Sequence, residues 1–201
     1  MLEYLIFPKT LSLIYGPPGS GKSTLCMQIT ANIPGKTIFI DTENSINIEK
    51  IQQINPLINL ENIIIIKAKR YSEQTKAITN LKAIKNSSLI IIDSFTVHYR
   101  KKTTLQKRLF INKSFTKMLV ELQQLNAPII ITSQIYTDFK KQNHPLAENI
   151  LRKFCTQIIE LKNNTKRTLT IENTKTIIPY TITNTGLTVE YLNFLPQEKN
   201  K

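Results

Sequence analysis

Runs of apolar residues recur along the first two-thirds of the chain, each short and bounded by polar or turn-forming residues. The segments Ile63–Ile66 and Leu89–Ile92 contain no polar residue, and a similar run follows Pro128 and ends at Gln134. An unbroken apolar run of this length is typical of a strand covered on both faces, as in a parallel sheet. We therefore predict buried strands at 11–15, 37–41, 63–66, 89–93 and 128–134.

Segments with helical spacing lie between these strands. Apolar residues fall on one side of a helix at 25–31 and again at 46–54, and Ser72 can cap a helix that extends to about residue 84. A longer helix is expected to fill much of the region from 94 to 125. Strands that alternate with helices in this way predict βα units on a parallel sheet.

The last third of the chain has a different pattern. Residues alternate between apolar and polar at 156–161, 167–171, 180–183 and 187–191, as they do in half-buried strands. The polar stretch 136–146 is expected to be a mobile loop. We expect a single domain over residues 1–201, with a βα core at about 1–155 and an antiparallel β extension at about 156–195.

One stretch between the first strand and the first helix carries the strongest chemical signal: Gly16-Pro17-Pro18-Gly19-Ser20-Gly21-Lys22-Ser23-Thr24. It fits G-x-x-x-x-G-K-[ST], the phosphate-binding loop, or P-loop. Glycines let the backbone curl and approach a ligand closely, so that N–H groups face inward at the start of a helix. We expect Lys22 to reach the β- and γ-phosphates of ATP, Ser23 to hold Mg²⁺, and Thr24 to lie near the α-phosphate. All nine residues are candidates for binding the cofactor.

Polar side chains at the ends of other strands complete a candidate site. Asp93 follows a buried apolar strand and is the expected second residue for the metal. Related ATPases often place Glu directly after this Asp, but Ser94 stands there, so the group that activates water must come from elsewhere. Glu43 lies just past the strand at 37–41, at the same carboxyl edge of the sheet. Gln134 can bind the γ-phosphate or the attacking water and report hydrolysis to the loop that follows it.

Charge adds a candidate partner. The chain has 27 Lys and Arg against 14 Asp and Glu, a net charge of +13, which favours nucleic acid or an acidic protein surface. A compositional bias toward Ile, Lys and Asn can also raise the isoelectric point. From Ser94 to Val120 there is no acidic residue, and the basic residues there are Arg100, Lys101, Lys102, Lys107, Arg108, Lys113 and Lys117. This segment is the candidate for DNA contact, with Tyr99 available for base stacking.

The cysteines, the histidines and the apolar runs predict no further functional site. Cys26 and Cys155 form no C-x-x-C pair and are expected to be buried, reduced thiols. The two histidines, His98 and His144, are isolated, and we expect structural or surface roles for them. No apolar run approaches 18 residues, and the first apolar stretch starts at Leu2, so we expect no membrane span, no signal peptide and no N-terminal accessory domain. The predicted location is the cytoplasm, at the nucleoid when DNA is bound.

Four segments in this order resemble the core of the RecA/RadA recombinases: 16–24, Ile40–Asn44, Ile90–Thr96 and Ile131–Tyr136. The resemblance continues through Val97–Arg100 and Pro145–Leu151 and spans nearly the whole chain. The short length and the compact segment after Gln134 are similar to the RadB family, the short archaeal paralogues of RadA.

The resemblance implies an α/β fold: a RecA-like P-loop ATPase core with a mainly parallel sheet flanked by helices and a C-terminal antiparallel β extension. It implies an ATP-binding, DNA-associated accessory ATPase in homologous recombination and DNA repair, with a recombinase or another repair protein as a partner. Glu43 would activate water, Asp93 would serve the metal, and Gln134 would sense the γ-phosphate. The phosphates and Mg²⁺ would be bound by Lys22, Ser23 and Thr24. The segment Arg100–Arg108 would correspond to a first DNA-binding loop, and Lys140-Lys141 to a shortened second one.

This sequence departs from the family pattern at three places. Asn47 stands where RadA often has an Arg that contacts adenine, and Glu172–Lys175 stands where RadB-like chains often have a Lys-His-Arg cluster. The Phe-x-x-Ala tether that links RadA subunits has no counterpart before the core, so we expect no RadA-like filament. Because no residue acting in trans can be assigned within the chain, we expect slow intrinsic hydrolysis.

Two alternatives remain open from the sequence. The first is a nucleotide-gated interaction module that docks on a recombinase or polymerase and binds little DNA itself. The second is a small-molecule kinase, since such enzymes also have this type of loop. Kinases of this class need clustered arginines around the acceptor phosphate, and the arginines here are dispersed: Arg70, Arg100, Arg108, Arg152 and Arg167.

Overall fold

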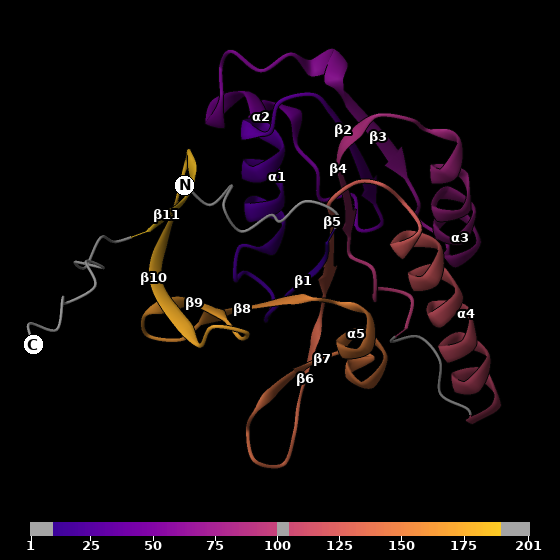
Figure 1. Ribbon diagram of the computed structural model, residues 1–201. Coiled ribbons are helices and arrows are strands. Elements are labelled where there is room, and N and C mark those ends of the chain that lie inside the picture. Colours follow the sequence, from indigo (N-terminus) through magenta and orange to yellow (C-terminus); the bar gives the residue numbers. More distant parts are fainter. Residues whose placement is uncertain (1–9, 100–104, 190–201) are drawn as a thin grey trace, which may run out of the picture.

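The central feature of the computed structural model is one nine-stranded sheet, shown in Figure 1. The structure describes residues 10–99 and 105–189. The strand order is β11-β10-β9-β8-β1-β5-β4-β2-β3. The parallel strands are β1 (Leu11–Tyr15), β2 (Lys36–Asp41), β3 (Ile63–Lys67), β4 (Ser87–Asp93), β5 (Ile129–Ser133) and β8 (Gln157–Asn163). The strands β9 (Arg167–Ile171), β10 (Thr176–Thr183) and β11 (Gly186–Val189) continue the same sheet in antiparallel fashion.

Helices cover both faces of this sheet. On one face lie α1 (Lys22–Asn32) and, against it, α2 (Ile48–Ile54). On the other lie α3 (Tyr71–Asn80), α4 (Leu105–Gln123) and α5 (Glu148–Phe154). Short 3-10 helices at Leu60–Asn62 and Leu81–Ala83 complete the helical elements of the described residues. The α/β fold with a mainly parallel sheet and an antiparallel extension, as predicted from the sequence, is confirmed.

The apolar runs are explained by burial on both faces. Successive residues of a strand point to opposite faces, so Ile38 and Ile40 pack toward α3 and α4 while Phe39 packs toward α1. In β4, Ile90 and Ile92 face the first cluster and Ile91 the second. A strand of this kind has no solvent-facing side, and its sequence therefore shows no alternation.

Several predictions about local structure are wrong in detail. Residues 136–146, predicted to be a mobile loop, contain regular structure, because β6 (Ile135–Thr137) pairs with β7 (Asn143–Pro145) as an antiparallel hairpin. Ser72 is not the cap of α3: the capping position is two residues earlier, at Arg70, whose N–H donates to Glu73 Oε2 at 3.0 Å. The first strand of the predicted extension, β8, pairs in parallel with β1, so the antiparallel part begins at β9.

Other expectations on the fold are confirmed or fall outside the description. Cys26 and Cys155 are both buried and form no disulfide. The predicted long helix is α4, and the short helix after the second strand is α2. The apolar stretch 2–7 and the basic residues Arg100, Lys101 and Lys102 lie outside the described residues. Within the described part of the chain, no helix combines the length and apolar character needed to cross a membrane.

Candidate nucleotide site

The P-loop joins the end of β1 to the start of α1, at the centre of the sheet. Gly19 and Gly21 have φ angles of 72° and 95°, in the left-handed region that glycine adopts without strain. A side chain at Gly16 would place its Cβ 2.2 Å from the carbonyl oxygen of Leu161 in β8. Glycine is therefore required at position 16 because the neighbouring strand passes too close for any Cβ.

The first turn of α1 presents the residues predicted to hold phosphates and metal. No side chain caps the helix at Gly21, so N–H groups at its start stay available to an anion. Ser23 and Thr24 are half-buried in this first turn. Lys22 Nζ donates to the carbonyl oxygens of Gly16 at 2.9 Å and Pro17 at 3.0 Å. Burial lowers the pKa of Lys22, and the negative charges of Asp93 and Glu43 act in the opposite direction.

Asp93 is held rigidly at the end of β4. It is 1% exposed, and both of its carboxylate oxygens accept hydrogen bonds from hydroxyl groups. Thr132 Oγ1 donates to Oδ1 at 2.5 Å, and Ser45 Oγ donates to Oδ2 at 2.8 Å. The peptide bond between Asp93 and Ser94 is cis. These contacts fix the orientation of a carboxylate at the carboxyl edge of the sheet.

Glu43 is brought to the same edge by the turn after β2. Buried Asp41 accepts the N–H of Ser45 at 3.0 Å and of Ile46 at 3.3 Å, which curls the segment that carries Glu43. Partial burial raises the pKa of Glu43, and the nearby charge of Asp93 raises it further. A higher pKa makes this carboxylate a stronger base than an ordinary surface glutamate.

Gln134 completes the group from the end of β5. Its side-chain amide donates to Glu43 Oε1, which joins two strand ends that lie 91 residues apart in sequence. The structure thus brings Lys22, Glu43, Asp93 and Gln134 together, because β1, β5, β4 and β2 are neighbours in the sheet and their carboxyl ends meet at one edge. The sequence patterns alone had placed these residues at strand ends; the strand order places them beside one another.

The oxygen atoms that this site offers to a metal ion are typical of a site for Mg²⁺, in which phosphate and water supply most of the ligands. The described residues contain no cluster of three or more His, Cys, Asp or Glu side chains that would bind a metal on their own. One hydroxyl from Ser23 and one carboxylate from Asp93 fit Mg²⁺, which usually takes few protein ligands and binds together with substrate phosphates. The residues present therefore fit a magnesium nucleotide better than a metal cage built by the protein.

The chain is similar to known proteins over most of its length. Residues 9–178 match the family described as "AAA domain". The chain is 36% identical over 165 residues to the DNA repair and recombination protein RadB of Thermococcus sibiricus, covering 76% of this chain and 71% of the relative. It is 35% identical over 191 residues to RadB of Methanococcus maripaludis strain C7, covering 86% and 87% of the two chains. The chain belongs to the RadB family.

A solved RadB structure has the same fold. The chain described as "Crystal structure of the RadB recombinase" superposes with a TM-score of 0.76 at 26% identity, covering 90% of this chain and 91% of the other. The resemblance to the RecA/RadA recombinases inferred from the sequence is thereby confirmed. With the family established, the chain is a member of the P-loop ATPases and a nucleotide-binding protein of the recombination and repair class.

The family departures noted in the sequence have structural explanations here. Asn47 caps α2, and its Oδ1 accepts the N–H of Lys50 at 3.0 Å. Glu172, where related chains often carry a basic residue, is paired with the guanidinium of Arg152 at 2.6 Å and accepts the hydroxyl of Tyr15 at 2.7 Å. Both positions are therefore occupied by side chains with a defined local partner.

The β6–β7 hairpin carries one of the two predicted DNA-contact segments. Lys140 and Lys141 lie exposed in its connection, next to Phe139, whose side chain is fully exposed. Sequence reasoning missed Phe139 as a candidate; an apolar residue inside an otherwise polar stretch was the available signal. Lys107 and Arg108 lie in the first turn of α4, but their side chains are outside the described part.

Ion pairs fix the base of the hairpin. His144 Nε2 lies 3.3 Å from Asp138 Oδ2, and His144 Nδ1 lies 3.0 Å from Glu148 Oε2. Hydrogen bonding to Glu148, and then to Asp138, raises the pKa of His144. Glu148 also pairs with Arg152 at 2.7 Å, so the hairpin is tied to α5 by charged side chains. The prediction of a structural role for His144 is in line with this position.

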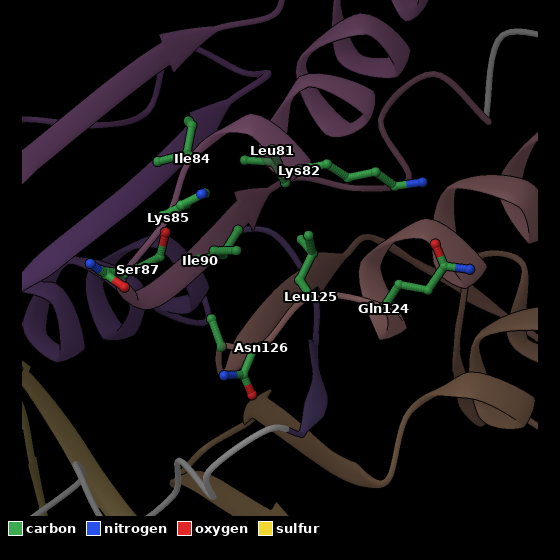
Figure 2. Close-up of a pocket in the computed structure, with 11 residues that line it drawn as sticks. Leu81, Lys82, Ile84, Lys85, Ser87, Ile90, Gln124, Leu125 and Asn126 are labelled. Atoms are coloured by element: carbon green, nitrogen blue, oxygen red, sulfur yellow. The ribbon is translucent and has the colours of Figure 1, made fainter.

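A separate cavity of about 480 Å³ lies away from the candidate site. Figure 2 shows its lining, which includes Leu81, Ile84, Ile90 and Leu125, with the exposed side chains of Lys82 and Lys85 near its rim. It is found at the amino ends of β4 and β5, opposite the edge where the P-loop lies. None of the predicted site residues contributes to it.

Proposed function

We propose that this chain is a magnesium-dependent ATPase that binds DNA and acts as an accessory factor in homologous recombination and repair. The observation that carries the proposal is the meeting of four strand ends, which places the P-loop lysine, two carboxylates and an amide at one edge of the sheet. Membership of the RadB family supports the recombination role.

The residues have distinct parts in this proposal. The P-loop, from Gly16 to Thr24, binds the phosphates through its N–H groups and Lys22. Ser23 and Asp93 hold Mg²⁺, which would neutralise phosphate charge when bound. Glu43 orients and deprotonates the attacking water, and its raised pKa suits that task.

Gln134 links the reaction to the hairpin. It binds Glu43 through its side chain, while its carbonyl oxygen accepts the N–H of Leu146 just after β7 at 2.9 Å. A change in the bonding of the Gln134 amide at the γ-phosphate therefore acts on both ends of the β6–β7 hairpin. We propose that nucleotide state sets the position of Lys140 and Lys141 in this way.

Hydrolysis by the isolated chain is expected to be slow. Of the arginines whose side chains the structure describes, Arg152 pairs with Glu148 and Glu172, and Arg167 donates to a P-loop carbonyl. Arg70 is largely exposed and lies 3.9 Å from Glu73. A cation that stabilises the transition state would then come from a partner. The same arrangement leaves no cluster of free arginines among the described residues for the acceptor of a small-molecule kinase.

The first test measures Mg²⁺–ATP binding by calorimetry, and turnover by phosphate release, for the wild type and for Lys22→Ala, Asp93→Asn and Glu43→Gln. We expect Lys22→Ala and Asp93→Asn to lose most of the affinity, whereas Glu43→Gln should retain binding and lose turnover. Wild-type protein that binds no nucleotide would refute the proposed site. Loss of both binding and turnover in Glu43→Gln would refute the assignment of Glu43 to water activation.

The second test addresses DNA. Fluorescence anisotropy with single- and double-stranded oligonucleotides is measured across a salt series, with and without Mg²⁺–ATP. Steeply salt-dependent binding is expected, and the double variant Lys140→Gln/Lys141→Asn should reduce the slope of log K against log salt by roughly 1 to 2. The control is Lys82→Gln/Lys85→Gln, which removes the same charge from the opposite end of the sheet. Absence of binding at low salt would favour the alternative function, a nucleotide-gated module that docks on a protein.

A further inference from the structure

The carbonyl groups of five consecutive P-loop residues, 16 to 20, each accept a hydrogen bond from a side chain. Those of Gly16 and Pro17 accept Lys22 Nζ. The next three accept side chains from far along the chain: Pro18 O from Asn163 Nδ2 at 3.0 Å, Gly19 O from Arg167 Nη1 at 2.7 Å, and Ser20 O from the Tyr180 hydroxyl at 2.5 Å. These three donors lie at the end of β8, in β9 and in β10.

Anchoring these carbonyls determines where the N–H groups point. The peptide unit is planar and trans, so its C=O and N–H lie on opposite sides. Holding the carbonyls of residues 18–20 toward β8, β9 and β10 turns the N–H groups of residues 19–21 to the other side of the loop. One of them, the N–H of Ser20, donates to Pro17 O at 3.2 Å within the loop. By holding the carbonyls, the strands β8, β9 and β10 orient the N–H groups that form an anion cradle.

Arg167 and Tyr180 lie next to each other and donate to adjacent carbonyls of the P-loop. Tyr180 is 2% exposed, and its burial raises the pKa of the hydroxyl, while the adjacent Arg167 guanidinium acts in the opposite direction. The hydroxyl thus stays protonated and serves as a donor at neutral pH. Asn163 is exposed to solvent, so water can replace its contact more easily.

The extension is also fastened to the helix that follows the loop. Gln28 in α1 exchanges two hydrogen bonds with Leu187 in β11: its Nε2 donates to Leu187 O at 3.0 Å, and its Oε1 accepts the Leu187 N–H at 2.7 Å. A Cβ at Gly21 would lie 3.0 Å from Ile182 Cδ1, so β10 also packs directly on the end of the loop. The strands β9–β11 and the P-loop are therefore held as one unit.

We propose that Arg167 and Tyr180 are positioning residues of the nucleotide site, which hold the P-loop in its phosphate-binding form without touching the phosphates. This proposal rests on the proposed function of the P-loop. It assigns the antiparallel extension a part in nucleotide affinity, beyond a role as an edge of the sheet.

The test compares Tyr180→Phe, Arg167→Ala and Arg167→Lys with the wild type, by calorimetric titration with Mg²⁺–ATP and Mg²⁺–ADP. The matched control is Tyr71→Phe, which removes a buried hydroxyl that has no hydrogen-bond partner among the described residues, on the other face of the sheet. Tyr180→Phe is expected to weaken the binding of both nucleotides about fivefold, the effect of one hydrogen bond, while Tyr71→Phe leaves it unchanged.

Arg167→Ala should weaken binding by a similar factor or more, and Arg167→Lys, which keeps a charged donor, should recover most of it. Urea unfolding without nucleotide is measured in parallel. If Arg167 had a purely structural role, Arg167→Ala would lower the free energy of unfolding, and Arg167→Lys would not restore nucleotide affinity. If wild type binds, Lys22→Ala does not, and the Arg167 and Tyr180 variants bind like the wild type, the positioning role is refuted. If wild type itself does not bind, the proposed function fails instead.

Discussion

The hydrogen bond from Thr132 to Asp93 allows a quantitative test of how the candidate metal carboxylate is held. Thr132 is fully buried, and its hydroxyl donates to Asp93 Oδ1 at 2.5 Å. Thr132→Val keeps the shape but removes the donor. Loss of a hydrogen bond to a charged group costs about 1.5–3 kcal/mol, and the added buried methyl returns about 0.8 kcal/mol. We expect the free energy of unfolding to fall by about 1–2 kcal/mol.

Thr30→Val is the matched control. Thr30 is 1% exposed in α1, and its hydroxyl donates to the neutral carbonyl of Cys26 at 2.9 Å, one turn back in the same helix. That carbonyl also receives the helical N–H bond, so removal of the hydroxyl leaves it satisfied. We expect a change of about 0.5 kcal/mol or less.

Both variants are compared with the wild type by urea unfolding at neutral pH, with the slope m checked for constancy. Equal losses for the two variants would contradict the reasoning, because they would show that any buried threonine hydroxyl costs the same. A loss below about 0.5 kcal/mol for Thr132→Val would also contradict the reasoning, because it would show that the Asp93 carboxylate gains little from the hydrogen bond that Thr132 donates.

Three further predictions concern the loop, the hairpin and the core. Gly16→Ala should abolish folding or Mg²⁺–ATP binding, because its Cβ would meet the Leu161 carbonyl. The Cβ of Gly19→Ala meets no atom within 4 Å, so this variant should lower the free energy of unfolding only by the strain of a positive φ, about 1–2 kcal/mol. Calorimetry measures nucleotide binding by both variants, and urea unfolding measures their stability. NMR titration should show the pKa of His144 above its ordinary value, and Glu148→Gln should lower it. Because the pKa of His144 is raised in the folded state, its contribution to the free energy of unfolding is fully present below the unfolded-state pKa and is lost as the pH rises through the folded-state pKa. Phe115→Ala, at a fully buried ring packed against other aromatic rings, should lower the free energy of unfolding by about 3–5 kcal/mol in a urea titration.

The parallel core and the strand-end residues could be predicted from the sequence because their signals are local. A short apolar run such as 89–92 is typical of a strand covered on both faces, and the P-loop pattern is defined by residues adjacent in the chain. The polar residue after each run then follows from the rule that ligands bind at the carboxyl edge of a parallel sheet.

The hairpin and the anchors of the P-loop could not be predicted in this way. The strands β6 and β7 are three residues each and mostly polar, and their pairing is supported by contacts of His144 with two carboxylates, which no periodicity reveals. Tyr180 meets the P-loop across 160 residues of sequence, and within its own strand it is an ordinary β residue. Such contacts depend on which strands are neighbours, which is known only once the sheet is assembled.

The place of β1 in the sheet has a consequence for biosynthesis. It is the earliest strand of the described chain, yet its neighbours are β5 and β8, with Leu11 opposite Ile129 and Ser12 opposite Gln157. Pairings this distant in sequence make folding slow, and a nascent chain arrested before Gln157 lacks one side of β1 altogether. The nucleotide loop is therefore synthesised before the two strands that flank β1, so ATP can stabilise the newly made protein only after β5 and β8 have also been synthesised.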